Sequence, residues 1–318
     1  MYVISASRRT DIPAFYSRWF MNRVRAGFCH WLNPFSNAVY RTALAPEDVI
    51  AFVFWTRNPR PLMAHLAELN ARGYKYYFGV SLLGYGRPLE THNPSLEEAI
   101  GTFQDLALQT DPRYVVWRYD PIVISSRTPP QYHVEHFAHI ARRLEGCTTR
   151  CIYSFVDFYG KTRRNLAQVT ATEGVTFTTL STDQRYRLLS DLAEIAAAHG
   201  ITLQSCCEDD ARHVAGVQTG SCVDLGLLRD LTGDRELMIK AHPTREFCGC
   251  VKSVDIGSYD TCLFGCRYCY ATNQRSTARR NFGAHDPNDT ILYRPPQLAG
   301  VDLDDQIYRA FAAAETES

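Results

Sequence analysis

Short apolar runs alternate with longer amphipathic stretches over residues 1–205 of the chain. Seven runs have the composition of β-strands, and they lie at residues 2–6, 29–32, 49–55, 75–82, 113–119, 150–156 and 201–205. Most of them are almost continuously apolar, which is typical of parallel strands covered on both faces. The pattern therefore predicts a parallel sheet in an α/β fold.

Between these runs, apolar residues recur at the spacing of one helix face. The clearest helix is predicted over residues 183–199, with Ser181 or Thr182 as its N-cap and Gly200 as its stop. About six to eight strand–helix units predict a TIM-like β/α barrel, either full or partial.

The alternation of short apolar runs and amphipathic stretches ends after residue 205, and this change divides the chain into regions. The barrel is predicted over residues 1–205, and a cysteine-rich region over 206–295 is expected to bind a cluster and pack on the barrel mouth. Within that region, residues 225–231 form a short helical patch. Residues 296–318 are expected to form a C-terminal extension with an amphipathic patch at 307–313.

Composition narrows the class of protein. Apolar residues make up 45% and charged residues 21% of the chain, and Lys+Arg equal Asp+Glu at 34 each. Balanced charge does not support nucleic-acid or membrane binding. No apolar run approaches the roughly 20 residues of a membrane span, and the N-terminus lacks a signal-peptide pattern. We therefore expect a cytoplasmic protein, whose 11 cysteines are metal ligands or core thiols rather than disulfides.

Charged side chains gather where the predicted strands end. These candidate catalytic residues are Arg8, Arg9, Asp11, Arg57, Arg118, Asp120 and Asp157. Because a barrel builds its active site from the carboxyl ends of its strands, we expect them to meet at one mouth. Arginines there would hold carboxylate or phosphate groups through paired hydrogen bonds. The alternative is an Arg–Asp ion-pair network that closes this end of the barrel.

Candidate metal ligands are most concentrated at residues 262–269. Cys262, Cys266 and Cys269 follow the spacing C-x3-C-x2-C, and Tyr268 precedes the last cysteine. Three thiolates are one ligand short of a closed four-ligand site, so either a fourth ligand comes from elsewhere or one position stays open to a substrate. Thiolates suit iron–sulfur clusters or zinc, but structural zinc usually takes paired C-x2-C knuckles.

A second set of cysteines precedes this run. Its members are Cys206, Cys222, Cys248 and Cys250, and Cys207 is an alternative to Cys206. Four thiols are the right number for an auxiliary [4Fe–4S] cluster, or less favourably for a structural zinc ion.

The run at 262–269 resembles the cluster motif of radical S-adenosylmethionine enzymes. This resemblance implies that Cys262, Cys266 and Cys269 bind a [4Fe–4S] cluster, that S-adenosylmethionine binds the fourth iron, and that Tyr268 contacts the adenine. In that superfamily the motif follows the first barrel strand, whereas here it lies near the C-terminus. Either the barrel is circularly permuted or a C-terminal arm carries the motif back to the mouth formed by Ser7, Arg8 and Arg9.

The chain as a whole resembles the family numbered 1848 in the domain-of-unknown-function series, over roughly residues 1–295. The resemblance rests on the segments Ser5-Ala6-Ser7-Arg8-Arg9-Thr10-Asp11-Ile12-Pro13, Trp55-Thr56-Arg57-Asn58-Pro59, Trp117-Arg118-Tyr119-Asp120-Pro121-Ile122 and Asp255-Ile256-Gly257-Ser258-Tyr259.

The resemblance to radical S-adenosylmethionine enzymes predicts reductive cleavage of S-adenosylmethionine to a 5′-deoxyadenosyl radical. The radical would abstract hydrogen from an unknown small-molecule or peptide substrate, and a donor such as flavodoxin or ferredoxin would supply the electron. A weak likeness of residues 56–59 and 268–270 to spore-photolyase-like enzymes points instead to nucleic acid, which the balanced charge does not support. The alternative function is a binding or regulatory module, in which zinc or a closed cluster stabilises the barrel without radical chemistry.

Overall fold

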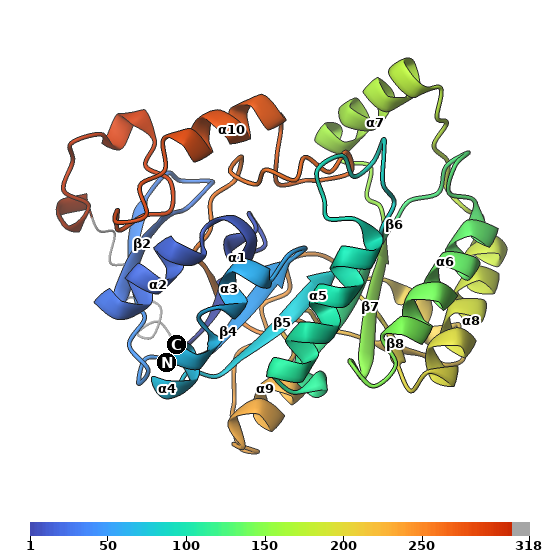
Figure 1. Ribbon diagram of the computed structural model, residues 1–318, viewed down its shortest axis with the longest axis horizontal. Helices are drawn as coiled ribbons and strands as arrows, with labels where there is room; N and C mark the ends of the chain where they lie inside the picture. The colour runs from blue at the N-terminus through green and yellow to red at the C-terminus, as the bar shows by residue number, and fades with distance from the viewer. Residues whose placement is uncertain (307–318) are drawn as a thin grey trace.

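Parallel strands form one eight-stranded sheet in the computed structural model, which describes residues 1–306 (Figure 1). The strands are β1 (Tyr2–Ala6), β4 (Val49–Thr56), β5 (Tyr76–Ser81), β6 (Val115–Ile122), β7 (Arg150–Phe155), β8 (Thr202–Ser205), β9 (Val217–Thr219) and β10 (Val254–Asp255). Their order is β10-β1-β4-β5-β6-β7-β8-β9, so β10 and β9 are the two edges. The predicted α/β fold with a parallel sheet is confirmed, but over residues 1–306 the sheet stays open and forms no closed barrel.

Helices connect the strands where the amphipathic stretches lie. They are α1 (Ile12–Phe15), α2 (Ser17–Ala26), α3 (Arg60–Met63), α4 (Leu66–Ala71), α5 (Leu96–Gln109), α6 (Pro130–Arg143), α7 (Gly160–Glu173), α8 (Thr182–Ala198), α9 (Leu225–Thr232) and α10 (Arg275–Gly283). The predicted capping of α8 is confirmed, because the Ser181 side chain accepts a hydrogen bond from the Gln184 N–H and Gly200 follows the helix with a φ of 69°. The helical patch at residues 225–231 is α9.

The apolar run at residues 29–32 is not a strand of the parallel sheet, and the prediction that it was one is wrong. It forms β2 (Phe28–Leu32), which pairs antiparallel with β3 (Val39–Ala43) in a separate two-stranded sheet. The connection between them is too short for a parallel crossover, which needs a dozen or more residues. Its apolar residues are buried partly against the end of the described chain, where His30 bridges to Ile291.

The sheet packs on both faces. Its outer face carries Phe54, Phe78 and Trp117, which pack against apolar residues of helices such as α5 and α6. Its inner face, which we define as the opposite one, carries residues from five strands that pack against the cysteine-rich region. These inner-face residues are Val3, Ala51, Val53, Trp55, Tyr77, Val116 and Ile152, and they contact Cys206, Cys222, Val223, Leu227, Leu228, Cys250 and Val251. Apolar residues of the cysteine-rich region therefore cover the inner face of the sheet, and the region also contributes strands β9 and β10 to the sheet.

The chain beyond α10 lies against the β2–β3 hairpin. Leu303 is buried with Val39 and Ile291, and the Asp304 carboxylate lies 3.2 Å from the His30 ring. The predicted patch at 307–313 lies outside the described residues. Within residues 1–306, no helix combines the length and apolar character that crossing a membrane requires.

A buried histidine predicts pH-dependent stability. The His133 Nδ1 lies 2.9 Å from the Tyr119 hydroxyl and its Nε2 lies 3.1 Å from the Val123 carbonyl oxygen, and burial lowers the pKa of His133 to about 4. Below pH 6.5 the unfolded chain therefore binds more protons than the folded one. The stability that comes from keeping His133 neutral is fully present above pH 6.5 and is lost as the pH falls toward 4.

Because of His133, we expect the free energy of unfolding, measured by urea denaturation, to fall by about 2 kcal/mol when the pH is lowered from 7.5 to 5. A His133→Gln variant should lose that part of the pH dependence. An unchanged dependence in the variant would contradict the assignment.

Candidate functional site

The C-terminal motif reaches the mouth of the sheet, the edge where the strands end, because β10 adds to β1. Ile4 pairs with Val254 and Ser5 with Asp255. The Asp255 carboxylate then accepts hydrogen bonds from the Ser5 hydroxyl (2.8 Å), the Ser7 hydroxyl (2.7 Å) and the Arg8 N–H (2.8 Å). Two segments far apart in the sequence thus form one unit, and a C-terminal arm returns the motif to the mouth.

Gly257 makes this unit sensitive to a single methyl group. An added Cβ would overlap the Ser7 hydroxyl and lie 3.2 Å from the Thr10 methyl group. We expect Gly257→Ala to lower the free energy of unfolding by about 1–3 kcal/mol, because overpacking forces backbone shifts. Gly101→Ala in α5 is the matched control, since nothing lies within 4 Å of its added Cβ, and it should gain about 0.5–1 kcal/mol. Equal free energies of unfolding for the Gly257→Ala and Gly101→Ala variants would contradict the prediction.

The three motif cysteines lie in one loop between β10 and α10, and each is partly exposed. Burial, Asp11 and the two neighbouring thiols raise the pKa of Cys262, and burial raises the pKa of Cys266 to about 12. Three neighbouring thiolates in such surroundings repel one another unless a cation compensates them. The donor set therefore fits a positively charged metal centre.

A buried network anchors this loop. The Arg57 guanidinium donates to the Glu90 carboxylate and to the Tyr268 hydroxyl, both at 2.6 Å, and the same hydroxyl also donates to Glu90. The Arg267 N–H adds a backbone hydrogen bond to the Leu89 carbonyl (3.0 Å). Arg57, which we predicted to be catalytic, therefore ties the motif to the loop that follows β5.

Two arginines lie beside Trp55 at the mouth. The Arg118 guanidinium lies 4.6 Å and that of Arg8 5.8 Å from the ring centre. Arg118 pairs with Asp120, and the Arg8 guanidinium donates to the Ser253 hydroxyl (2.8 Å). We call Arg8, Trp55 and Arg118 the arginine layer.

The arginine layer lies next to both cysteine sets. The Tyr270 hydroxyl, one residue beyond the motif, donates to the Arg8 carbonyl (2.9 Å). Although burial opposes the charge of Arg118, Asp120 and the nearby Cys222 and Cys206 thiols raise its pKa. The layer therefore lies close to the end of the motif and to Cys206 and Cys222 of the second set.

The other predicted residues have different surroundings. Asp11 caps α1 and accepts from the Ala14 and Arg57 N–H groups at 2.9 and 2.7 Å, and burial raises its pKa to about 7. Arg9 donates to backbone carbonyls and lies 3.9 Å from Asp255. Asp157 pairs with Arg245 at the cavity lined by Cys207. Their predicted catalytic roles stay predictions.

Comparison with known families decides where the chain belongs. The family model described as "Domain of unknown function (DUF1848)" matches residues 3–271. The chain is a member of this family. The match includes both cysteine sets and all four segments on which the resemblance rested. No curated protein matches the chain.

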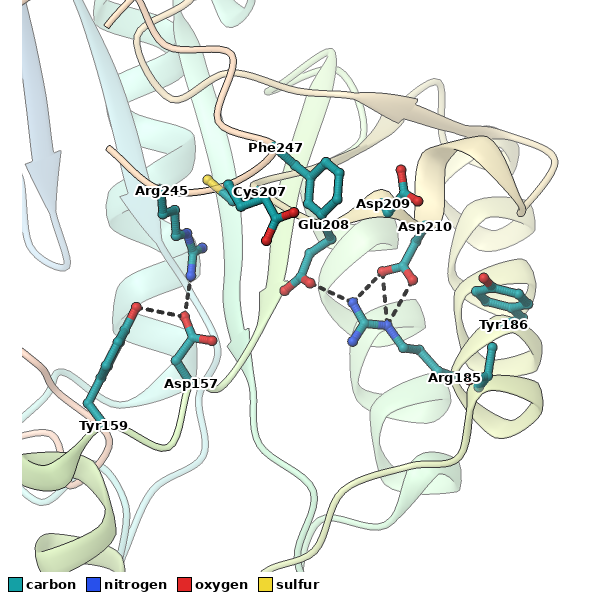
Figure 2. A pocket seen from close by; sticks show the side chains of 12 residues that line it. Asp157, Tyr159, Arg185, Tyr186, Cys207, Glu208, Asp209, Asp210, Arg245 and Phe247 are labelled. Carbon is teal, nitrogen blue, oxygen red and sulfur yellow. Dashed lines mark hydrogen bonds and ion pairs between the residues drawn. The ribbon is translucent and has the colours of Figure 1, made fainter. Parts of the chain in front are cut away.

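The second cysteine set lies beside an open cavity within the DUF1848 match. The cavity has a volume of about 420 Å³ and is lined by residues that include Cys207, Asp157, Glu208, Arg245 and Phe247 (Figure 2). The Cys206 sulfur lies 3.1 Å from that of Cys222. Over the described part of the chain, no three His, Cys, Asp or Glu side chains are arranged as a ready-made site for a metal ion.

Sequence reasoning missed several residues of the site. Glu90 and Asn93 lie in a loop rich in glycine and proline, and no spacing marked them; the Asn93 side-chain oxygen lies 3.6 Å from the Cys266 sulfur. Ser253 likewise had no motif around it. Tyr270 could have been found, because it directly follows the motif.

Proposed function

We propose that this protein is a radical S-adenosylmethionine-type enzyme whose cluster is held by Cys262, Cys266 and Cys269. The observation that carries the proposal is the placement of these three thiols in one loop, anchored at the mouth by Arg57, Glu90 and Tyr268. When bound there, a [4Fe–4S] cluster with S-adenosylmethionine would supply a 5′-deoxyadenosyl radical that abstracts hydrogen from a substrate.

The protein's own residues would bind and orient that substrate. The buried Nε of Arg118 has no hydrogen-bond partner among residues 1–306, so it is available to an acceptor such as a carboxylate or phosphate oxygen. The Arg8 guanidinium also lies near the Trp55 ring, 5.8 Å from its centre. Together they support binding of a small molecule or peptide with an acidic group. Tyr268, predicted to contact the adenine, has a buried ring next to Tyr85.

Anaerobic purification tests the proposal. We expect a brown protein that contains iron and sulfide and that releases 5′-deoxyadenosine when it is reduced with dithionite, or with flavodoxin or ferredoxin, in the presence of S-adenosylmethionine. A colourless protein that contains zinc and is unchanged by cluster reconstitution would overturn the proposal and support a metal-stabilised binding module.

A further inference from the structure

Five cysteines from three separate segments meet on the inner face of the sheet. Cys206 and Cys207 follow β8, Cys222 follows β9, and Cys248 and Cys250 lie between α9 and β10. The Cys206 sulfur lies 3.1 Å from that of Cys222 and 3.8 Å from that of Cys207. Cys250 lies within hydrogen-bonding reach of Cys222 and Cys248, and Cys248 lies within reach of Cys207. The five sulfurs therefore form a ring of contacts, which we call the thiol ring.

The spacing of these sulfurs matches the ligand shell of one tetrahedral metal ion. A zinc ion holds thiolate sulfurs at about 2.3 Å, so two sulfurs of one tetrahedron lie about 3.8 Å apart. The separations of 3.1 and 3.8 Å in the thiol ring are just below and equal to this value. In an iron–sulfur cluster each cysteine binds a different iron, and the cluster atoms hold the ligands farther apart. The ring therefore fits a single ion better than the auxiliary cluster that the number of cysteines favoured.

Four thiols of the ring suit a site that is closed to solvent. Cys206, Cys222 and Cys250 are buried in the inner-face core, and Cys248 is half-buried against it. The Val223 N–H donates to the Cys250 sulfur (3.3 Å), which is the kind of outer-shell contact that orients a metal ligand. Structural zinc sites take four protein ligands and leave no open position, so these four thiols are sufficient.

Cys207 is the fifth thiol, and it lies on the cavity side of the ring. It is half-buried, it has a φ of 59°, and it lines the cavity of about 420 Å³. Figure 2 shows it between Arg245 and Phe247. Because a closed tetrahedral site has no place for a fifth sulfur, the thiol at the cavity is the one that remains free.

Guanidinium groups lie close to the thiol ring. Arg8 and Arg118 lie near Cys222, and Arg245 donates to the Cys206 carbonyl (3.3 Å). Four thiolates around a divalent ion leave a net negative charge, so these cations would stabilise the loaded site.

We propose that Cys206, Cys222, Cys248 and Cys250 bind one zinc ion in a tetrahedral site, with Cys207 as a non-ligating thiol at the cavity. No three such side chains of the described chain lie ready-made around one point, so binding has to rearrange the sulfurs. The Cys206–Cys222 separation would open from 3.1 Å to about 3.8 Å. The ion would join the segments after β8 and β9 to the segment before β10, and this role does not depend on radical chemistry at the motif.

The first test removes the motif thiols and measures the metal that remains. The full chain with Cys262→Ala, Cys266→Ala and Cys269→Ala is purified anaerobically, incubated with zinc, iron and sulfide, and desalted, and its content of each is measured. We expect about one zinc ion per chain, because four thiolates complete one tetrahedral site. A variant that binds no zinc, or that takes up iron and sulfide instead, would overturn the assignment.

Cobalt tests the geometry of the site in the same triple variant. Co²⁺ can take the place of zinc, and its visible absorption bands are intense when four thiolates surround it in a tetrahedron. We expect these bands to saturate at about one Co²⁺ per chain and to vanish when zinc is added, since zinc binds thiolates more tightly. Cobalt that binds without these bands would show that four thiolates do not hold the ion.

Single substitutions in that background test the ligand set. Cys250→Ser should lower zinc affinity by more than about 100-fold, since loss of an outer-shell partner alone costs 10–100-fold. The serine oxygen can still accept from the Val223 N–H. Cys207→Ala should keep the zinc, as should Cys147→Ala, the matched control with a half-buried thiol elsewhere. Unchanged affinity in Cys250→Ser, or loss of zinc from Cys207→Ala, would overturn the ligand set. If the wild-type protein makes no 5′-deoxyadenosine but the triple variant keeps its zinc, the proposed function fails and the zinc site stands.

Discussion

Replacing Cys266 by alanine should abolish reductive cleavage of S-adenosylmethionine. Cys266 is the central thiol of the motif, and its sulfur lies beside Asn93 in the loop anchored by Arg57. Loss of an outer-shell partner typically costs 10–100-fold in metal affinity or activity, and loss of a direct ligand costs more. We expect 5′-deoxyadenosine to fall by more than about 100-fold, to the level of the reductant alone.

Two control variants separate this effect from general damage. Cys147→Ala removes a half-buried thiol outside both sets and should leave the yield of 5′-deoxyadenosine unchanged. Cys250→Ala alters the second set and should keep the iron at the motif. Wild-type yield from Cys266→Ala would show that the motif does not perform the cleavage. Loss of all iron from Cys250→Ala would contradict the division into two sites.

The sequence predicted those parts of the fold whose signals are local. The strand at β4 is continuously apolar and α8 has both a capping serine and a terminating glycine, so neither needed tertiary information. Arg8 and Arg118 were expected at the mouth because strand ends converge there, and both lie beside Trp55.

The remaining parts depend on long-range contacts. β10 has two residues and one of them is Asp255, whose carboxylate is stabilised by hydroxyl and N–H groups from β1 and the loop after it. The segment after β9 reads as polar, yet a few of its apolar residues, such as Val223 and Leu228, fill the inner face. Such contacts join residues far apart in the chain, so no regular spacing of apolar residues marks them in the sequence. For β2 the local signal was present, but it predicted the wrong partner. Apolar composition indicates a strand and does not tell parallel from antiparallel pairing.

Replacing Glu90 by alanine should destabilise the protein more than the other substitutions for which we predict a change in stability. Glu90 is 5% exposed, and it accepts hydrogen bonds from the Arg57 guanidinium, the Tyr268 hydroxyl and the Tyr85 N–H. Without it, the Arg57 guanidinium, whose side chain is only 14% exposed, loses its counter-charge. Breaking a buried ion pair in this way costs about 3–5 kcal/mol, and we expect a matching fall in the free energy of unfolding from urea denaturation.

Glu68→Ala is the matched control for this substitution. Glu68 pairs with Arg25 at 2.5 Å, but both side chains are well exposed, at 30% and 44%. Exposed pairs contribute about 0–1 kcal/mol because water screens them, so Glu68→Ala should cost far less than Glu90→Ala. Because Tyr268 is part of the network, Glu90→Ala should also loosen the motif loop and lower iron retention at Cys262, Cys266 and Cys269. Equal costs for the two substitutions, with full iron retention, would show that the buried network does not anchor the motif.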